Sequence, residues 1–313
     1  MYAVFVAVEG DVDLMSGREH PPAARTLEPD GAFDLARTCA PVHWARGRWP
    51  NVDWRDDTLY WLGWEGERVV WRSVLQHGSG SLTIGGSAGS HRDADWGAQV
   101  LSIAADMPVF ADPVLAELAR KHSGMRPWAA GSLYEGFVSS IVGQSISVAA
   151  AAVTERRLYA QFNTARELAG RLYWPPPHRE QLAAADPAFV RESGVTLARA
   201  EALVAVAACF RDLDVDNGPF QAEALRSRAE SLLPIRGVGR WTVESALLWG
   251  VGYDDAHPSG DVALLRAARR HWPDIATVKC LDRRAEEWKP HRAWAARFLW
   301  LDLLGFPGSG DRP

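Results

Sequence analysis

Residues 222–250, AEALRSRAESLLPIRGVGRWTVESALLWG, hold the pattern that decides the fold. Apolar residues recur at helical spacing on both sides of Pro234, which predicts two helices joined by a tight turn. In this turn Gly237 and Gly239 flank Val238, so the backbone can approach another chain closely while the valine packs between the helices. The amides of the turn, and those that open the second helix, then point outward as unpaired donors that suit a phosphate.

The chain around this hairpin, which spans residues 234–240, is also helical in pattern. Apolar residues recur at helical spacing in segments such as PVLAELARKH (113–122), LARAEALVAVAACFRDL (197–213) and AWAARFLWLDLL (293–304). Short links rich in Gly, Pro and Asp separate them. We therefore expect a compact all-helical domain over residues 109–306, followed by a short tail at 307–313.

The N-terminal part of the chain has a different pattern. Residues 1–30 mix charge with prolines and predict an irregular lead-in. Between 31 and 108, the short runs TLYWLGW, RVVWRSVL and SLTI are bounded by turn signals, which predicts a small antiparallel sheet. The Gly/Ser-rich segment GGSAGSH (85–91) predicts a linker to the helices. The predicted fold class is α+β, mostly helical, with the sheet domain first.

Composition excludes several classes of protein. The chain has 313 residues, is 47% hydrophobic and carries a net charge of −5, so any attraction to nucleic acid must be local. It has no apolar run long enough to span a membrane and no signal peptide, which predicts a cytosolic protein with no membrane partner. Cys39, Cys209 and Cys280 lie far apart and predict reduced, buried thiols. No cofactor or metal set is indicated, and the histidines lack the spacing of a metal hydrolase.

A second informative segment is HPSGDVAL, residues 257–264. A Pro/Ser/Gly turn delivers Asp261 to the start of a helix, where either Asp261 or Ser259 can serve as a plain N-cap. The helix dipole and amide donors also favour an ionised carboxylate at this position. Facing a sugar whose base is leaving, such a carboxylate can stabilise the positive charge that develops at C1′ and orient a water.

Together these motifs resemble the helix-hairpin-helix DNA glycosylase superfamily, most closely the 3-methyladenine DNA glycosylase II branch. Pro234 before the turn and Arg240-Trp241-Thr242 after it are similar to that family's hairpin, and Asp261 stands twenty residues beyond Trp241, as the catalytic aspartate does there. The resemblance covers residues 31 to about 305. It implies that Asp261 is the catalytic acid/base. Members that also nick the strand have a lysine where this chain has Trp241, so the resemblance implies a monofunctional enzyme.

The resemblance also implies a pocket for the damaged base. Trp241 and Trp300, the latter in a segment similar to the family's W-K-P-x-R helix, are its expected aromatic walls, because cationic alkylated purines can stack against electron-rich rings. Ser245 and Val262 stand where the family has tyrosines, and Tyr134 is a further candidate. Ethenoadenine, 7-methylguanine, 1-methyladenine and hypoxanthine therefore stay open as substrates beside 3-methyladenine.

Contacts to double-stranded DNA with damaged bases are implied for two further sets of residues. The segment Gly143-Gln144-Ser145 is similar to the family's G-Q-x-x-S junction, so Gln144, Ser145 or a neighbouring loop would fill the gap that a flipped base leaves. The hairpin contributes Arg236, Gly237, Gly239, Arg240 and Thr242, and a monovalent cation at its carbonyls would fit the resemblance. Arg266, Arg269 and Arg270 are weaker candidates, because charge runs usually mark solvated helix faces.

Three functions stay open at this point. The first is a monofunctional glycosylase for alkylated purines, acting as a monomer. The second is a glycosylase for another lesion, such as hypoxanthine or ethenoadenine. The third is a helix-hairpin-helix DNA-binding protein with no catalysis, which would need no acid opposite an aromatic slot. A combined 8-oxoguanine glycosylase and lyase is disfavoured by the missing lysine.

Overall fold

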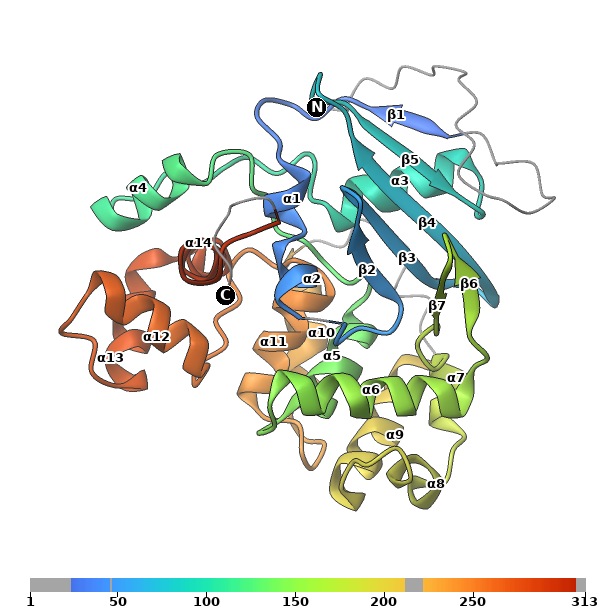
Figure 1. Cartoon of the computed structure of the whole chain (residues 1–313). Helices are drawn as coiled ribbons and strands as arrows, with labels where there is room; N and C mark the ends of the chain where they lie inside the picture. The colour runs from blue at the N-terminus through green and yellow to red at the C-terminus, as the bar shows by residue number, and fades with distance from the viewer. Residues whose placement is uncertain (1–23, 46, 212–221, 308–313) are drawn as a thin grey trace.

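A computed structural model of the chain describes residues 24–45, 47–211 and 222–307. Figure 1 shows a twisted sheet in the upper part of the molecule and a group of helices below and beside it. The lead-in before residue 24 and the tail after 307 lie outside the described residues. Within the described ranges, no helix is both long enough and apolar enough to cross a membrane.

The sheet has five antiparallel strands in the order β1-β5-β4-β3-β2. They are β1 (Arg25–Leu27), β2 (Val52–Arg55), β3 (Thr58–Glu65), β4 (Arg68–Gln76) and β5 (Leu82–Gly86). Inward-facing residues of alternating strand positions, such as Leu59, Val74 and Ile84, are buried beneath it. The antiparallel α+β architecture with a helical majority is as the sequence predicts.

Four details of the N-terminal part differ from the expected pattern. β1 lies inside the expected irregular lead-in 1–30, because its three residues pair with β5. Two short helices, α1 (Leu35–Thr38) and α2 (Ala40–Trp44), precede the strands, and α3 (Ser90–Val100) begins directly after the segment expected to be a linker. Gly97 of α3 packs against Ile84 of β5, so the expected linker connects two parts of one core. The described residues among 31–108 therefore contain three helices as well as strands.

The helical part consists of eleven α-helices and one 3-10 turn among the described residues. Their bounds are α4 (Pro113–Lys121), α5 (Leu133–Gly143), α6 (Val148–Phe162), α7 (Arg179–Ala183), α8 (Pro187–Arg191), α9 (Leu197–Arg211), α10 (Ala222–Glu230), α11 (Arg240–Gly250), α12 (Val262–His271), α13 (Val278–Ala285), η1 (Glu286–Trp288) and α14 (Arg292–Leu304). A two-stranded ribbon, β6 (Arg166–Leu168) with β7 (Arg171–Tyr173), interrupts them.

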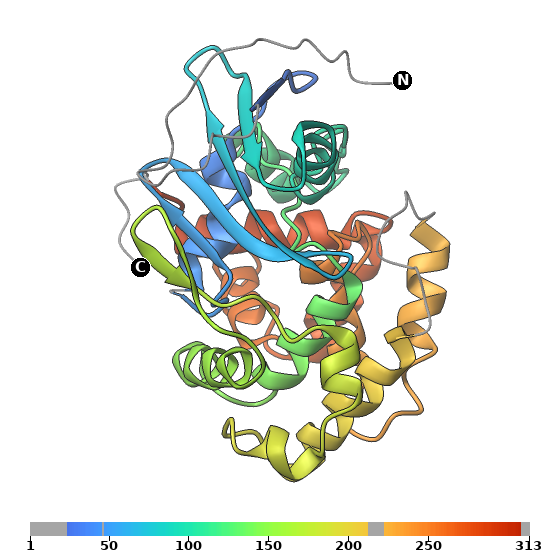
Figure 2. The same cartoon turned by 90° about the vertical axis from the view of Figure 1, so that its right-hand side faces the viewer.

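The ribbon was not predicted, because the sequence pattern suggested helices alone in this region. Leu168 and Tyr173 bury against Leu62 on the sheet, and Arg171 forms an ion pair with Asp53 at 2.9 Å. Figure 2 shows the ribbon alongside the sheet, above the helices. The ribbon therefore joins the helical part to the far face of the sheet.

Helices α5 and α11 form the centre of the helical part, where they run antiparallel in close contact. At one end the amide of Gly131 donates to the Gly250 carbonyl, and at the other Gln144 contacts Thr242. The helices touch backbone to backbone at Gly136 and Gly250. A Cβ on Gly136 would lie 2.5 Å from the Ala246 carbonyl oxygen, so only glycine fits there.

The first prediction concerns this crossing. We expect Gly136→Ala to lower the free energy of unfolding by about 1 to 3 kcal/mol, because the added methyl overpacks a backbone contact, even though alanine is the better helix former. Urea unfolding followed by circular dichroism measures the difference. Gly78→Ala is the matched control, since nothing lies near its Cβ position. A Gly136→Ala protein as stable as the control would contradict the close packing.

Candidate active site

The predicted hairpin joins α10 to α11 through residues 231–239. Val238 is buried beneath the turn, while Gly237 adopts a φ of +92°, a conformation that favours glycine. Gly239 is the N-cap residue of α11. Arg236, Gly237, Gly239 and Arg240 are exposed, whereas Thr242 is buried. The turn thus presents backbone and two arginines to solvent at the start of a helix, as expected for a phosphate site.

Gln144 braces this hairpin from the end of α5. Its Nε2 donates to the Gly237 carbonyl at 2.8 Å and to Thr242 Oγ1 at 2.9 Å. Its own carbonyl accepts a hydrogen bond from Arg199 of α9. The side chain is therefore held in place, so the structure does not favour Gln144 as the gap-filling residue.

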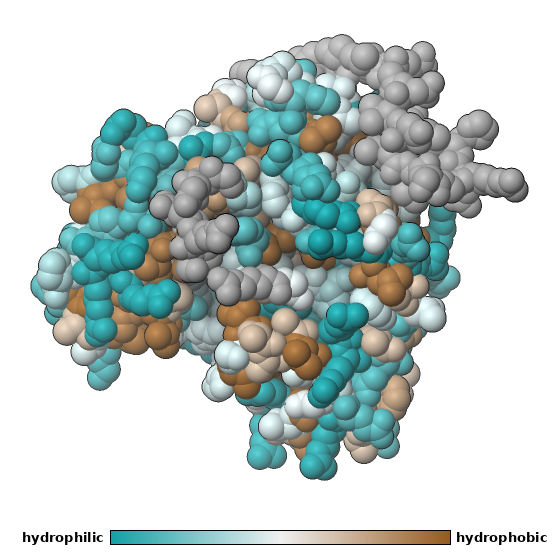
Figure 3. Space-filling model, viewed as in Figure 1, coloured by the Kyte–Doolittle hydropathy of each residue, from teal (hydrophilic) through white to brown (hydrophobic). Residues whose placement is uncertain are grey.

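The loop after Gln144 carries the exposed residues of this junction. Ser145 is exposed with a φ of +53°, which turns the chain sharply. Ile146 and Val148 follow as exposed apolar side chains. On the face seen in Figure 3, hydrophobic residues form small groups among hydrophilic ones. An apolar loop tip thus lies beside the hairpin, in the region where the sequence predicts Gln144, Ser145 or a neighbouring loop as the gap filler without singling out Ile146.

Asp261 is the N-cap of α12, where its Oδ1 accepts a hydrogen bond from the Leu264 amide at 2.7 Å. Burial raises the pKa of its carboxyl, while hydrogen bonds from the amides of Leu264 and Ala263 and from the Trp300 side chain lower it. The expected amide donors do favour the anion, but desolvation outweighs them. The next residue, Val262, is exposed.

An aromatic wall lies behind Asp261. Trp300 of α14 stacks on Trp249 of α11, with ring centroids 5.3 Å apart and an interplanar angle of 25°. Trp249 was not predicted as a site residue. It follows Trp241 and Ser245 at intervals of four, so the three side chains share one face of α11. That helical spacing was the available signal.

The other predicted pocket residues on this face differ in their surroundings. Ser245 is buried, and its hydroxyl has no hydrogen-bond partner among the described residues. Trp241 is partly buried next to the hairpin. The α11 face therefore runs from Trp241 at the hairpin, past Ser245, to Trp249 beneath Trp300.

Buried polar contacts hold the loop that carries Asp261. Glu244 of α11 accepts hydrogen bonds from Arg226 at 2.9 Å and from the His257 amide at 2.9 Å. Asp282 of α13 lies 2.8 Å from His257 Nε2 and accepts a hydrogen bond from Ser259 at 2.7 Å. The turn before Asp261 is thus tied to α10, α11 and α13, which fixes the position of the carboxylate.

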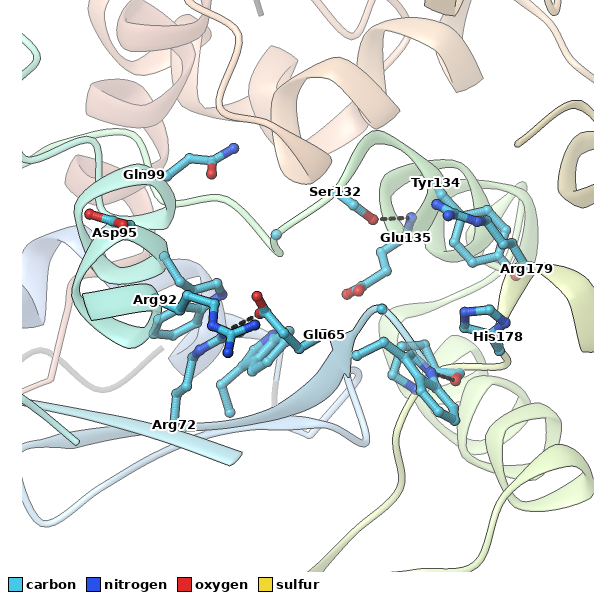
Figure 4. A pocket seen from close by; sticks show the side chains of 16 residues that line it. Glu65, Arg72, Arg92, Asp95, Gln99, Ser132, Tyr134, Glu135, His178 and Arg179 are labelled. Atoms are coloured by element: carbon cyan, nitrogen blue, oxygen red, sulfur yellow. Dashed lines mark hydrogen bonds and ion pairs between the residues drawn. The ribbon is translucent and has the colours of Figure 1, made fainter. Parts of the chain in front are cut away.

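Tyr134 does not join these residues, in contrast to the prediction. It lies in the first turn of α5, at the end of that helix opposite to Gln144, and its hydroxyl donates to the Pro177 carbonyl. There it lines a cavity of about 380 Å³ between the sheet, α3 and the start of α5. Figure 4 shows Glu65 and Glu135 projecting into this cavity, with Arg92 and Arg179 on opposite sides. Sequence could not place Tyr134, because position along a helix does not say which end faces the site.

In the described part of the chain, no group of three or more His, Cys, Asp or Glu side chains could hold a metal ion. A cation at the hairpin would need backbone carbonyls instead. The Gly237 carbonyl accepts one hydrogen bond from Gln144, which leaves its second lone pair open. The arginines of α12 are also partly occupied, since Arg269 and Arg270 donate to backbone carbonyls.

The second prediction follows from the half-buried carboxyl of Asp261. Because the folded state raises the pKa of Asp261 above 3.8, stability falls as the pH rises from the unfolded pKa through the folded one. Asparagine never ionises and still caps helices, so Asp261→Asn should be more stable than the native protein at pH 7. The gain should shrink as the pH is lowered toward about 4. Urea unfolding at several pH values tests this.

The control for that experiment is Asp186→Asn, at the exposed N-cap of α8. This exchange replaces one good N-cap residue with another at an exposed position, so it should change the stability at pH 7 little. A native protein that is more stable than Asp261→Asn at neutral pH would show that the carboxylate contributes net stability where it stands.

Comparison of the sequence with known proteins finds several relatives, although no family model matches. The chain is 30% identical over 197 residues to DNA-3-methyladenine glycosylase 2 of Escherichia coli, covering 62% of this chain and 66% of that protein. It is 25% identical over 195 residues to DNA-3-methyladenine glycosylase of Bacillus subtilis, covering 62% and 64%. It is 32% identical over 196 residues to the probable bifunctional transcriptional activator/DNA repair enzyme AlkA of Mycobacterium tuberculosis, covering 62% and 38%. The match spans less than two thirds of each relative.

Solved structures with the same fold cover more of the chain. The 3-methyladenine DNA glycosylase of Archaeoglobus fulgidus superimposes with a TM-score of 0.73 at 19% identity, over 88% of this chain and 97% of that one. An 8-oxoguanine glycosylase/lyase of Clostridium acetobutylicum gives 0.67 at 16% identity, over 88% and 93%. At these identities the likeness concerns the fold alone, and it includes the N-terminal sheet. Fold, hairpin and sequence similarity together support the assignment of this chain to the helix-hairpin-helix DNA glycosylase superfamily, in the branch of the 3-methyladenine DNA glycosylases II.

Proposed function

We propose that this protein is a monofunctional DNA glycosylase of base excision repair that hydrolytically releases alkylated purines, of the 3-methyladenine type, and leaves an abasic site. The observation that carries the proposal is Asp261, a half-buried carboxyl fixed at a helix start beside the stacked rings of Trp300 and Trp249. A protein that only binds DNA has no need of a desolvated acid against an aromatic wall.

In the proposed reaction Asp261 acts on the sugar. As the bond between C1′ and the base nitrogen breaks, the ionised carboxylate stabilises the positive charge that develops on the sugar ring. It then accepts a proton from the water that attacks C1′. The Leu264 amide at 2.7 Å and the contacts of Glu244 and Asp282 with the preceding loop keep the carboxylate in place. The released base carries away the bonding electrons.

The absence of lyase activity forms part of the proposal. Strand cleavage by this route requires an amine that forms a Schiff base with the sugar. The chain has three lysines, Lys121, Lys279 and Lys289, and Trp241 stands at the family's lysine position. Lys121 pairs with Asp302 and Lys289 with Glu286, whereas Lys279 is exposed on α13. None of them belongs to the hairpin or the aromatic wall.

Double-stranded DNA with a damaged base is the proposed partner, bound by one copy of the chain. The turn of Gly237 and Gly239, with Arg236 and Arg240, would bind phosphates next to the lesion. Ile146, rather than Gln144, would enter the gap left by the flipped base. Its side chain is exposed and apolar, and Gln144 beside it holds the loop against the hairpin. A single chain thus carries the acid, the wall and the DNA contacts.

The third prediction is the test of function. Under single-turnover conditions the native protein should free bases from alkylated duplex DNA, with strand breaks only after alkali. Asp261→Asn should reduce the rate by roughly a hundredfold or more, as expected for a catalytic acid/base, while still binding DNA. Treatment with borohydride should trap no covalent complex. If the native protein binds DNA but frees no base from any lesion tried, it is a binding protein instead.

The fourth prediction concerns the gap-filling residue. We expect Ile146→Ala to slow base release by about tenfold, a loss of about 1.4 kcal/mol in transition-state stabilisation, because less side chain props the flipped state open. Val153→Ala, at another exposed apolar position on α6, is the control and should have little effect. Comparable rates for Ile146→Ala and the native protein would assign the wedge to another residue.

A further inference from the structure

Arg297 on α14 is a charged side chain in an unusual place. It is fully buried, and within the described residues it forms no ion pair with a carboxylate. Its Nη2 donates to the carbonyls of Trp128 and Leu248, both at 2.8 Å. Its Nε and Nη1 are buried without a partner among the described residues. Burial lowers the pKa of the guanidinium to about 9, so it stays protonated at neutral pH.

Burying a charge with so few partners is costly, and an apolar side chain of similar size usually costs the fold less. The side chain of a neutral amide residue could donate the same two hydrogen bonds to these carbonyls. Buried charges of this kind cluster at functional sites, which directs attention to what Arg297 faces.

Arg297 faces the aromatic wall of the candidate active site. Its guanidinium carbon lies 5.0 Å from the centre of the Trp249 ring, and Trp249 in turn stacks on Trp300 at 5.3 Å. The two distances together place the positive charge no further than about 10 Å from the Trp300 ring, a range over which charges still interact in a protein interior. Asp254, on the loop after α11, is the acidic group whose negative charge acts on Arg297 and raises its pKa.

The wall is also less electron-rich than the wall of the resembled family. Ser245 and Val262 occupy the two positions where that family has tyrosines, and the ring of Trp249 already has a cation against it. An aromatic ring attracts cations through the negative charge on its faces. The guanidinium of Arg297 already makes this contact with Trp249, and its own positive charge repels a second cation. A second cation stacked on this wall would therefore meet repulsion that a neutral ring would not.

We propose that Arg297 is a specificity-determining residue that makes the pocket accelerate release of electrically neutral damaged purines, such as 1,N6-ethenoadenine and hypoxanthine, more than release of cationic ones, such as 7-methylguanine. The inference rests on the proposed function, because it concerns the same pocket. Asp261 acts on the sugar whether the damaged base is neutral or cationic, so its charge does not remove the difference in acceleration between the two classes of base. Arg297 touches neither the sugar nor the breaking bond.

The experiment compares two variants of similar size. Arg297→Met removes the charge, and Arg297→Lys keeps it. Single-turnover rates are measured with the protein below saturation, so that they include insertion of the base into the pocket. Each duplex contains one lesion, either ethenoadenine, hypoxanthine or 7-methylguanine. The quantity of interest is the ratio of the 7-methylguanine rate to the ethenoadenine rate. Partial loss of folded protein changes both rates equally, so the ratio does not depend on stability.

We expect Arg297→Met to raise this ratio by about tenfold, the effect of one charge across about 10 Å at an effective dielectric constant of about 20. Arg297→Lys should leave the ratio near the native value. An unchanged ratio in Arg297→Met would overturn the inference and leave Arg297 with a purely structural role. A native protein that frees none of the three bases would instead contradict the proposed function.

A second measurement needs no variant and covers the case in which Arg297→Met does not fold. Each native rate is divided by the rate of spontaneous base loss from the same duplex without protein. The acceleration should be greater for ethenoadenine and hypoxanthine than for 7-methylguanine. Equal accelerations, or a greater one for 7-methylguanine, would overturn the proposed selectivity.

Discussion

The backbone contact between α5 and α11 is the constraint on which the rest of this structure depends. Gly136 and Gly250 let the two helices approach without side chains between them. That closeness brings Gln144 against the hairpin at one end of the pair. Along α11 it also fixes the direction in which Trp241, Ser245 and Trp249 face. The hairpin turn and the aromatic wall are therefore positioned by one packing contact.

The ionisable groups at the site, Asp261 and Arg297, lower the stability of the fold but suit the proposed reaction. Desolvation raises the pKa of Asp261, and the neighbouring helix α14 buries Arg297 with two nitrogens that have no partner among the described residues. Each is a cost that the surrounding core must offset. The core does so through a large apolar cluster that includes α5, α9, α11 and α14. Sites that hold strained or desolvated groups in a rigid frame are the expected compromise in an enzyme.

Local signals predicted much of the fold and the acid. The glycine turn, the helical periods and the twenty-residue interval from Trp241 to Asp261 each lie within one stretch of sequence. Features that depend on distant partners were missed. β1 is a strand only because β5 pairs with it, and Trp249 belongs to the wall only because Trp300 stacks on it. Tyr134 was assigned to the pocket, although it lies at the other end of α5.

The sequence by itself determined the hairpin, the capping position of Asp261 and the lack of a lysine at Trp241, because turns, caps and residue identity are local properties. Only the tertiary structure decided that Gln144 braces the hairpin, that Ile146 is left exposed beside it, and that Arg297 lies buried against Trp249. Those outcomes depend on how helices far apart in the chain pack together, and packing depends on the shapes and charges of both partners at once.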